Sequence, residues 1–296
     1  MAMSLEEKLK IVNVMRQKEA EKAVDHNIIA RYPVKEIKEI FVNTRSGKAH
    51  IYINYPLEGE KPYPLYVNMH GGGFVKGHFS QDELFCRKVC NAVNSAVIDI
   101  DYKIAPEFMF PYALNECYDV IKWAYENHKE LGIDKNKIAV GGHSAGANIA
   151  IGITLMANER SEFPIACQVL DYPPTDLYGD PALKELACDT VVPAKKAELY
   201  TDMYIKKEDR RNIFASPIFA KSEQLKGLPP ALIITAELDS LCSEGEKYAS
   251  MLVSSGVEVT AKRFLGCKHG FTIACSEGHE AAEKMIFNAL TKSFSC

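Results

Sequence analysis

The sequence predicts an α/β fold in which helices cover both faces of a mostly parallel central sheet. Short apolar segments with strand character alternate with helical segments, an order that is typical of parallel sheets. The chain has 296 residues, 47% of them hydrophobic and 25% charged, which is enough for one large domain or two small ones. A glycine-flanked serine, Ser144, stands where one predicted strand meets a helix. We expect a single domain over residues 1–296.

The first elements precede the alternating part. Residues 4–30 carry Leu5, Leu9, Val12 and Met15 at helical spacing, and Pro33 ends this segment. Two apolar or alternating runs around residues 45–48 are expected to pair as an antiparallel hairpin. They are Ile37–Thr44 and Ala49–Tyr55.

Strands and helices then alternate to the end of the chain. The strands are expected at Leu65–Met69, Ala96–Ile100, Ile138–Gly141, Ile165–Leu170, Ala231–Thr235 and Val257–Phe264. The helices are expected at Gln81–Val93, Tyr112–Leu131, Ala147–Met156, Cys242–Ser255 and His279–Phe294.

Residues 175–226 interrupt this alternation. They contain three prolines and a helical segment near residues 194–205, and they are too long for a connection and too short for a separate domain. Ligands bind at the carboxyl edge of such sheets, so we expect this insertion to cover that edge. Tyr200, Met203 and Tyr204 are candidates to line a pocket there, or to form the core of the insertion itself.

Charge and composition exclude several classes of partner. The net charge of −4 does not suggest a polyanionic partner, and the pairs at 195–196, 206–207 and 210–211 are interpreted as a solvated face rather than a nucleic-acid site. No apolar run approaches the roughly 20 residues that span a bilayer, so no transmembrane segment is expected. Glu6, Glu7 and Lys8 stand where a signal peptide would be apolar, which favours the cytoplasm.

The nine cysteines are scattered and form no Cys-x-x-Cys pair. Cys86 and Cys90 are four residues apart, which places them on one helix face rather than in a metal clip. We expect reduced thiols and neither a metal nor a cofactor.

The strongest chemical signal is Gly142-His143-Ser144-Ala145-Gly146, which fits the Gly-x-Ser-x-Gly nucleophile elbow. The motif needs a strand before it and a helix after it, and both are predicted here. A tight turn between them leaves no room for side chains beside the serine, which accounts for the flanking glycines. Ser144 is therefore the candidate nucleophile.

A serine nucleophile needs a base, and the base needs an acid that orients it. In this fold type both follow the serine along the chain, the acid first. Glu237 and Asp239 follow a late strand and are both candidates for the acid, with Asp239 further out on the loop. His269 follows the next strand and is the candidate base, whereas the elbow holds the neighbouring His143 away from the hydroxyl of Ser144.

Four further histidines, His26, His50, His128 and His279, lie in polar contexts and are expected at the surface. His70-Gly71-Gly72-Gly73-Phe74 follows a predicted strand, and its glycines would let backbone N–H groups approach a substrate oxygen. The N–H of Ala145, the residue after the serine, is a further expected donor.

Together these segments resemble the hormone-sensitive-lipase-like branch of the α/β-hydrolase esterases. The resemblance covers about residues 37–295 and rests on the glycine motif at 70–74, Asp101–Glu107, the elbow with Asn148, Asp239, and His269-Gly270-Phe271. It is reinforced by Asp171-Tyr172-Pro173 and Ala215-Ser216-Pro217. It implies oxyanion donors at Gly72, Gly73 and Ala145, and a helical cap formed by residues 1–36 and 175–226. His143 and Ala147 depart from the family pattern, which usually has Asp or Thr and a second Gly there.

The resemblance implies a serine carboxylesterase that hydrolyses short-to-medium acyl esters of small molecules rather than long-chain triglycerides, and it leaves a homodimer open. Removal of acetyl groups from sugars or metabolites, and amide or peptide cleavage, would use the same groups. A ligand receptor without turnover, like the plant gibberellin receptors that resemble this family, is disfavoured because His269 is present.

Overall fold

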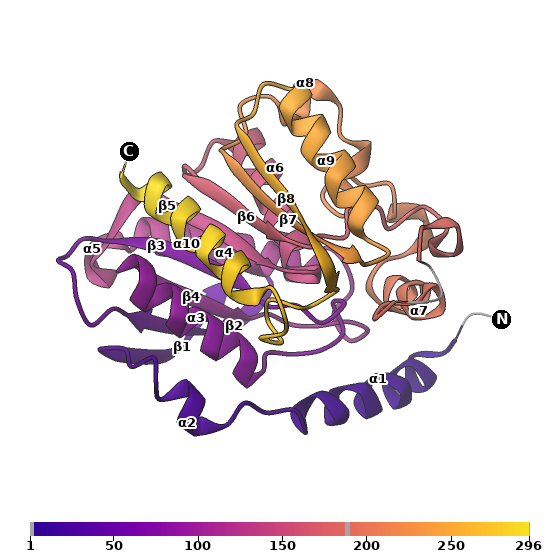
Figure 1. The fold of residues 1–296 in the computed structure, drawn as a ribbon, viewed down its shortest axis with the longest axis horizontal. Helices are drawn as coiled ribbons and strands as arrows, with labels where there is room; N and C mark the ends of the chain where they lie inside the picture. Colours follow the sequence, from indigo (N-terminus) through magenta and orange to yellow (C-terminus); the bar gives the residue numbers. More distant parts are fainter. Residues whose placement is uncertain (1–2, 187–189, 296) are drawn as a thin grey trace.

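The structure is a computed structural model that describes residues 3–186 and 190–295 (Figure 1). Eight strands of the described residues form one sheet, in the order β1-β2-β4-β3-β5-β6-β7-β8. Their bounds are β1 Glu36–Thr44, β2 Gly47–Tyr55, β3 Tyr63–Met69, β4 Ala96–Asp101, β5 Ile133–His143, β6 Cys167–Asp171, β7 Ala231–Leu238 and β8 Val259–Lys268. Strands β1 and β2 form an antiparallel hairpin, and β2 also pairs antiparallel with β4. The other strands of the sheet run parallel to β4 and to one another. The predicted α/β fold is confirmed.

Helices cover both faces of this sheet, as Figure 1 shows. They are α3 Ser80–Val93, α4 Tyr112–Glu126, α5 His128–Leu131, α6 Ala145–Arg160, α9 Cys242–Ser254 and α10 His279–Ser295. Successive strand residues point to opposite faces. Leu65 and Ile98 therefore join the core that includes α4, α6 and α9, whereas Tyr66 and Val97 join the core under α3 and α10.

Helix α6 lies in the larger of these two cores and carries the serine elbow at its start. Every residue from Ala145 to Ala157 is buried, so this part of the helix is enclosed by protein on all sides. Fixed between the sheet and its neighbours, α6 gives the elbow a rigid support.

The segment before the hairpin forms α1 Leu5–Ala20 and the single turn α2 His26–Ile29. Ser4 and Glu7 form a capping box that starts α1. Arg16 then fastens the helix to the body of the molecule, since it donates to the carbonyls of Val75 and Ala105 at 2.8 and 2.9 Å. Its guanidinium also binds both carboxylate oxygens of Glu107, at 2.7 and 2.8 Å.

The insertion between β6 and β7 contains α7 Ala194–Tyr204, α8 Ser222–Leu225 and the 3₁₀ turns Pro181–Leu183, Lys207–Asp209 and Pro217–Phe219. Lys8 of α1 donates to the carbonyl of Asp202 on α7 at 2.7 Å, so the two segments meet although they are far apart in sequence (Figure 1). Among the helices of the described residues, none has the length and apolar character that crossing a bilayer requires.

Several predicted bounds were wrong. The helix predicted over 112–131 divides at Asn127, whose backbone and side-chain N–H groups both donate to the carbonyl of Trp123 and close α4. The hairpin turn is shorter than predicted, because Gly47 already pairs with Thr44. Strands β5 and β8 extend beyond their apolar centres, since a strand that has a neighbour can continue through polar residues.

Candidate active site

Ser144 lies at the carboxyl end of β5 in a strained turn, with φ 54° and ψ −116°. The glycines two residues before and after it are required by the carbonyl end of β3. A Cβ at Gly142 or Gly146 would lie 2.2 or 1.9 Å from the carbonyl oxygen of Met69. The glycine spacing of the motif therefore reflects close packing of the elbow against the neighbouring strand.

The structure brings Ser144, His269 and Asp239 together at the carboxyl edge of the sheet. Nε2 of His269 lies 2.9 Å from Oγ of Ser144, and Nδ1 of His269 lies 2.7 Å from Oδ2 of Asp239. His269 directly follows β8 and Asp239 directly follows β7. Asp239 is only 2% exposed and also accepts a hydrogen bond from the backbone N–H of Leu241. A serine, a base and a buried acid are thus linked in the order that acyl transfer needs.

Glu237, the other predicted acid, has a different contact. Its Oε2 accepts the backbone N–H of Gly266 at 2.7 Å, inside the β8 strand. The carboxylate therefore supports β8, whereas Asp239 binds the imidazole of His269.

The glycine-rich loop after β3 lies beside the elbow. Gly72 and Gly73 have φ values of 115° and 63°, which favour glycine. A Cβ on Gly73 would lie 2.4 Å from the ring of Tyr200. The backbone N–H groups of Gly72, Gly73 and Ala145 find no acceptor in the described part of the chain, and all three residues line the same cavity as Ser144 and His269.

A buried histidine–aspartate pair that the sequence analysis missed fixes the far end of this loop. Nε2 of His78 lies 2.6 Å from Oδ2 of Asp99, and Asn68 donates to the other oxygen of Asp99 at 2.8 Å. Burial disfavours the charged imidazole, but the carboxylate of Asp99 outweighs it and raises the pKa of His78 to about 9. Only the pairing of β3 with β4 places Asn68 opposite Asp99.

His143 forms a second such pair beneath the elbow. Its Nδ1 lies 2.8 Å from Oδ2 of Asp171 and 3.2 Å from the hydroxyl of Tyr172. The backbone N–H of Ser144 donates to the carbonyl of Asp171 at 2.8 Å. This arrangement explains how the chain accommodates a histidine at a position where the family usually has Asp or Thr.

The cavity above Ser144 has a volume of about 360 Å³. Its wall combines the elbow and the glycine loop with the end of α1 and the turn after it, through Glu19 and Lys22, and with α7, through Lys196 and Tyr200. The three residues of the insertion that were candidates to line a pocket have different positions. Tyr200 lines the cavity, whereas Met203 and Tyr204 do not, because they are buried in the core, where the Tyr204 ring stacks on Phe74 at 3.7 Å.

The four histidines predicted at the surface differ in their exposure. His26 is exposed, whereas His50, His128 and His279 are half-buried. Each of these three has a hydrogen-bond partner; His50 lies between Glu39 and Asp101. Cys86 and Cys90 both lie on α3, in the helix that was predicted there, and both are free and buried.

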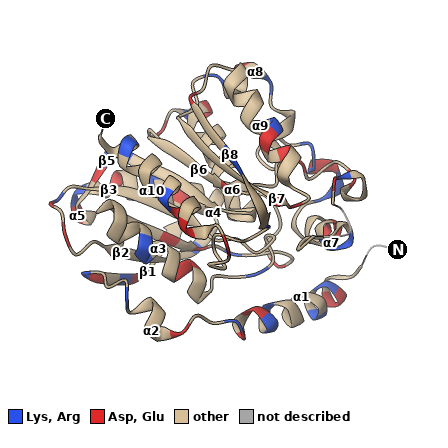
Figure 2. Cartoon of the chain, in the orientation of Figure 1, with Lys and Arg blue, Asp and Glu red and all other residues tan. Residues whose placement is uncertain are grey.

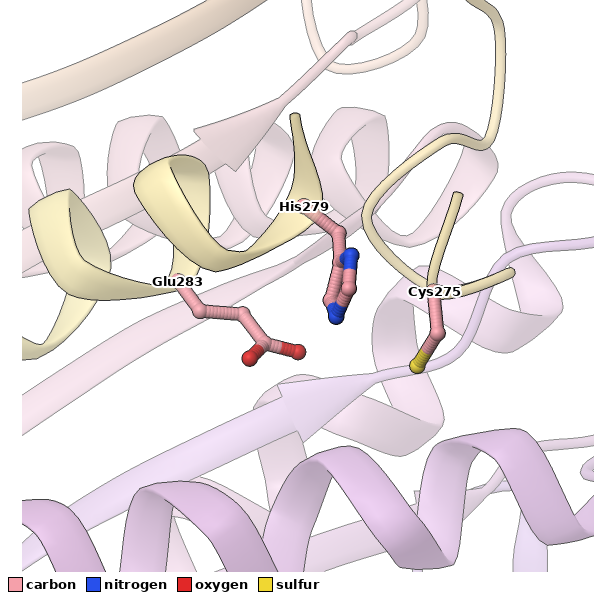
Figure 3. Close-up of side chains that lie close together, drawn as sticks. All are labelled: Cys275, His279 and Glu283. Atoms are coloured by element: carbon pink, nitrogen blue, oxygen red, sulfur yellow. The ribbon is translucent and has the colours of Figure 1, made fainter. Parts of the chain in front are cut away.

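One group of potential metal ligands lies near the start of α10. Cys275, His279 and Glu283 converge there, as Figure 3 shows, and their ligand atoms lie within 4.8 Å of one another. The ammonium of Lys88 binds Glu283 at 2.7 Å and lies 3.5 Å from Sγ of Cys275. Because a protein cation already neutralises Glu283, we assign no metal to this cluster.

Comparison with known proteins places the chain among esterases. A family model described as alpha/beta hydrolase fold matches residues 66–273. An arylesterase of Saccharolobus solfataricus is 34% identical over 251 residues, which are 82% of this chain and 79% of the relative.

Solved structures agree with this relationship. The hyperthermophilic esterase of Pyrobaculum calidifontis superimposes with a TM-score of 0.87 and 33% identity, over 99% of both chains. An esterase of Rhizomucor miehei gives a TM-score of 0.88 and 34% identity, over 96% of this chain and 91% of that one. The chain therefore belongs to the α/β-hydrolase fold family, in the hormone-sensitive-lipase-like branch that its motifs predicted.

Proposed function

We propose that this protein is a serine carboxylesterase in which Ser144, His269 and Asp239 form the catalytic triad. The observation that carries the proposal is the chain of two hydrogen bonds from Asp239 through His269 to Ser144, 2.7 and 2.9 Å long. Ser144 and His269 line a cavity beside three backbone N–H donors that have no acceptor among the described residues. The esterase relatives favour an ester as the substrate.

In the first half-reaction, Oγ of Ser144 attacks the ester carbonyl carbon while Nε2 of His269 takes its proton. Asp239 accepts the N–H on Nδ1 and stabilises the imidazolium that forms. The C–O bond to the alcohol then breaks, and His269 returns the proton to the leaving oxygen. In the second half-reaction, water takes the place of the alcohol. His269 removes a proton from this water, whose oxygen attacks the carbonyl carbon of the acyl-enzyme. The bond from that carbon to Oγ of Ser144 then breaks, His269 returns the proton to Oγ, and the carboxylic acid leaves.

The negative charge that develops on the carbonyl oxygen needs donors already in place. We assign this role to the N–H groups of Gly72, Gly73 and Ala145. The positive end of the long helix α6 points at the same oxygen and adds to the stabilisation. Removal of one such donor typically lowers kcat by about 10²–10³-fold.

The nucleophile is tested directly with a fluorophosphonate probe and a chromogenic short-chain ester. Ser144→Ala should lower the rate by about four or more orders of magnitude, keep the fold, and lose the label. Labelling that persists in the variant would place the nucleophile elsewhere. Amides should be assayed beside the esters, because the same groups could cleave either.

The substrate size follows from the volume of the partly closed cavity. With about 360 Å³ available, the cavity takes esters of small molecules with short-to-medium acyl chains. We expect activity to peak at roughly two to eight acyl carbons, since a pocket of this size cannot bury a longer chain. Residues 1–36 and 175–226 form the cap in this proposal, and Tyr200 closes the wall beside Gly73.

A chain-length profile of wild type and Tyr200→Ala tests the role of the cap. The variant should hydrolyse esters with longer acyl chains than the wild type does. If the wild type itself prefers emulsified long-chain lipid, the cap does not limit the length of the acyl chain.

We also infer a reducing compartment, the cytoplasm, because the seven described cysteines are all free. Thiol titration of freshly purified protein tests this point, and light scattering tests the homodimer.

A further inference from the structure

The cap side of the cavity carries an excess of positive charge. It is lined by Glu19 from α1, Lys22 from the turn after α1, Lys76 from the loop after Gly73, and Lys196 from α7. In Figure 2 the ribbons of α1 and α7 carry both the blue of Lys and Arg and the red of Asp and Glu. These four residues bring three ammonium groups and one carboxylate to the wall.

Glu19 is already engaged by two of the three lysines. Its Oε2 binds Nζ of Lys76 closely and lies 3.5 Å from Nζ of Lys22. Burial opposes the charge of this carboxylate, but Lys76 outweighs it and holds the pKa of Glu19 below its usual range. Lys196 forms no ion pair with Glu19 among the described contacts, although the charge of Glu19 acts on it from a distance.

Lys196 is a half-buried cation without an acidic partner among the described residues. Its Nζ donates to the carbonyl of Val191 at 3.2 Å and lies 5.8 Å from the centre of the Tyr200 ring. Burial, and then the charge of Lys76, lower the pKa of Lys196, and the charge of Glu19 opposes this shift without cancelling it. An arriving anion would relieve both effects.

The remaining charged groups of the cavity wall have contacts of their own. Lys184 pairs with Glu244, which is buried. Asp176 accepts the backbone N–H groups of its own turn, and Asp82 accepts the N–H of Phe79 at the start of α3. None of them neutralises Lys196.

The cationic wall lies close to the proposed oxyanion loop. A Cβ on Gly72 would touch Cβ of Lys76, and a Cβ on Gly73 would touch the ring of Tyr200, which lies beside Lys196. An anionic group a few bonds from the reacting ester could therefore reach Lys196.

We propose that the preferred substrate is an ester that also carries a carboxylate or another anionic group, which binds Lys196. The proposal rests on the esterase function proposed above. A charge-assisted hydrogen bond in a partly closed cavity discriminates an anion from its neutral isostere by about tenfold or more. Lys76 adds attraction to the same group, whereas Glu19 opposes it.

The test compares kcat/KM for matched ester pairs that differ only in charge. For the acyl part, the pair is the 4-nitrophenyl monoester of adipic acid and the same ester of adipamic acid. For the alcohol part, it is the butyrate esters of 4-hydroxybenzoate and 4-hydroxybenzamide. The wild type should prefer the anionic member of at least one pair by about tenfold, and the favoured pair shows which part of the substrate faces Lys196.

Variants identify the residue responsible. Lys196→Met should remove most of this preference, and Lys196→Arg should keep it. Lys195→Met is the matched control, since Lys195 is exposed and lies outside the cavity wall; its anion-to-amide ratio should equal that of the wild type. Glu19→Gln, on a different helix, removes a negative charge from the wall and should raise the anion-to-amide ratio of kcat/KM. This variant still tests the proposal if Lys196→Met does not fold.

Equal rates for the anionic and amide members of both pairs, or a preference that survives in Lys196→Met, would overturn the proposal. Failure of the esterase assignment looks different, since neither member of a pair would then be hydrolysed and Ser144 would not take the fluorophosphonate label.

Discussion

Two histidine–aspartate pairs flank Ser144, and the same contact has a different chemical meaning in each. In both, Nδ1 of the ring meets Oδ2 of a buried aspartate, at 2.7 Å for His269–Asp239 and 2.8 Å for His143–Asp171. The other ring nitrogen differs. Nε2 of His269 faces Oγ of Ser144, whereas Nε2 of His143 is buried without a partner among the described residues.

This difference follows from the elements that carry each ring. His269 leaves β8 on a loop at the sheet edge and turns toward the cavity. His143 is the last residue of β5, and its ring packs against the edge of Phe85 under α3, with centroids 4.4 Å apart. An imidazole beside the nucleophile in sequence is therefore structural, and one that is remote in sequence is positioned to act as the base.

The largest effect is expected from His269→Ala. Without a base, Oγ of Ser144 keeps its proton, so kcat should fall by about 10⁴-fold or more while the melting temperature stays close to that of the wild type. Steady-state ester hydrolysis and circular dichroism measure the two quantities. Activity within tenfold of the wild type would mean that another group serves as the base.

Asp239→Asn should come next, with a loss of about 10³–10⁴-fold in kcat, because an amide can neither orient His269 nor stabilise its imidazolium. Glu237→Gln is the matched control two residues away, and it should cost less than tenfold because the hydrogen bond that Glu237 accepts comes from the backbone of Gly266 and not from His269. A larger loss in Glu237→Gln than in Asp239→Asn would reverse the assignment of the acid.

The pair beneath the elbow should affect stability more than chemistry. Asp171→Asn weakens a buried hydrogen bond to His143, so we expect the free energy of unfolding to fall by about 2 kcal/mol. The kcat of the folded protein should change by less than tenfold. Urea denaturation and active-site titration separate the two effects, and a loss of kcat as large as that of Asp239→Asn would show that both pairs take part in catalysis.

A third pair, His78–Asp99, extends the comparison to pH. The pKa of His78 is raised in the folded state to about 9 from an ordinary value of 6.5. Its contribution to stability is therefore complete below about pH 6.5 and is lost as the pH rises toward 9. Urea denaturation at pH 6 and pH 9.5 should show this decrease in the wild type and a smaller one in His78→Gln; equal slopes would contradict the assigned charge.

Much of the fold and of the candidate site could be predicted because local chemistry is visible in the sequence. The alternation of apolar strand segments with helical segments predicted a sheet that helices cover on both faces. The spacing of Gly142, Ser144 and Gly146 predicted a turn that excludes Cβ atoms. Glu237 and Asp239 could not be separated in this way. Both follow the same predicted strand, although β7 extends through Glu237 in the structure. Only the pairing of β8 with β7 brings Gly266 to Glu237 and His269 to Asp239.

The sequence by itself determined which residues are able to do chemistry, whereas the tertiary structure decided what each of them faces. The partners of His143 and His78 depend on strand neighbours, because Asp171 and Asp99 reach them only when β6 lies beside β5 and β4 beside β3. Lys195 and Lys196 are chemically identical neighbours, yet only Lys196 lines the cavity. Residue type is encoded locally, but orientation, burial and the nearest opposite charge depend on contacts between distant segments, which no local pattern contains.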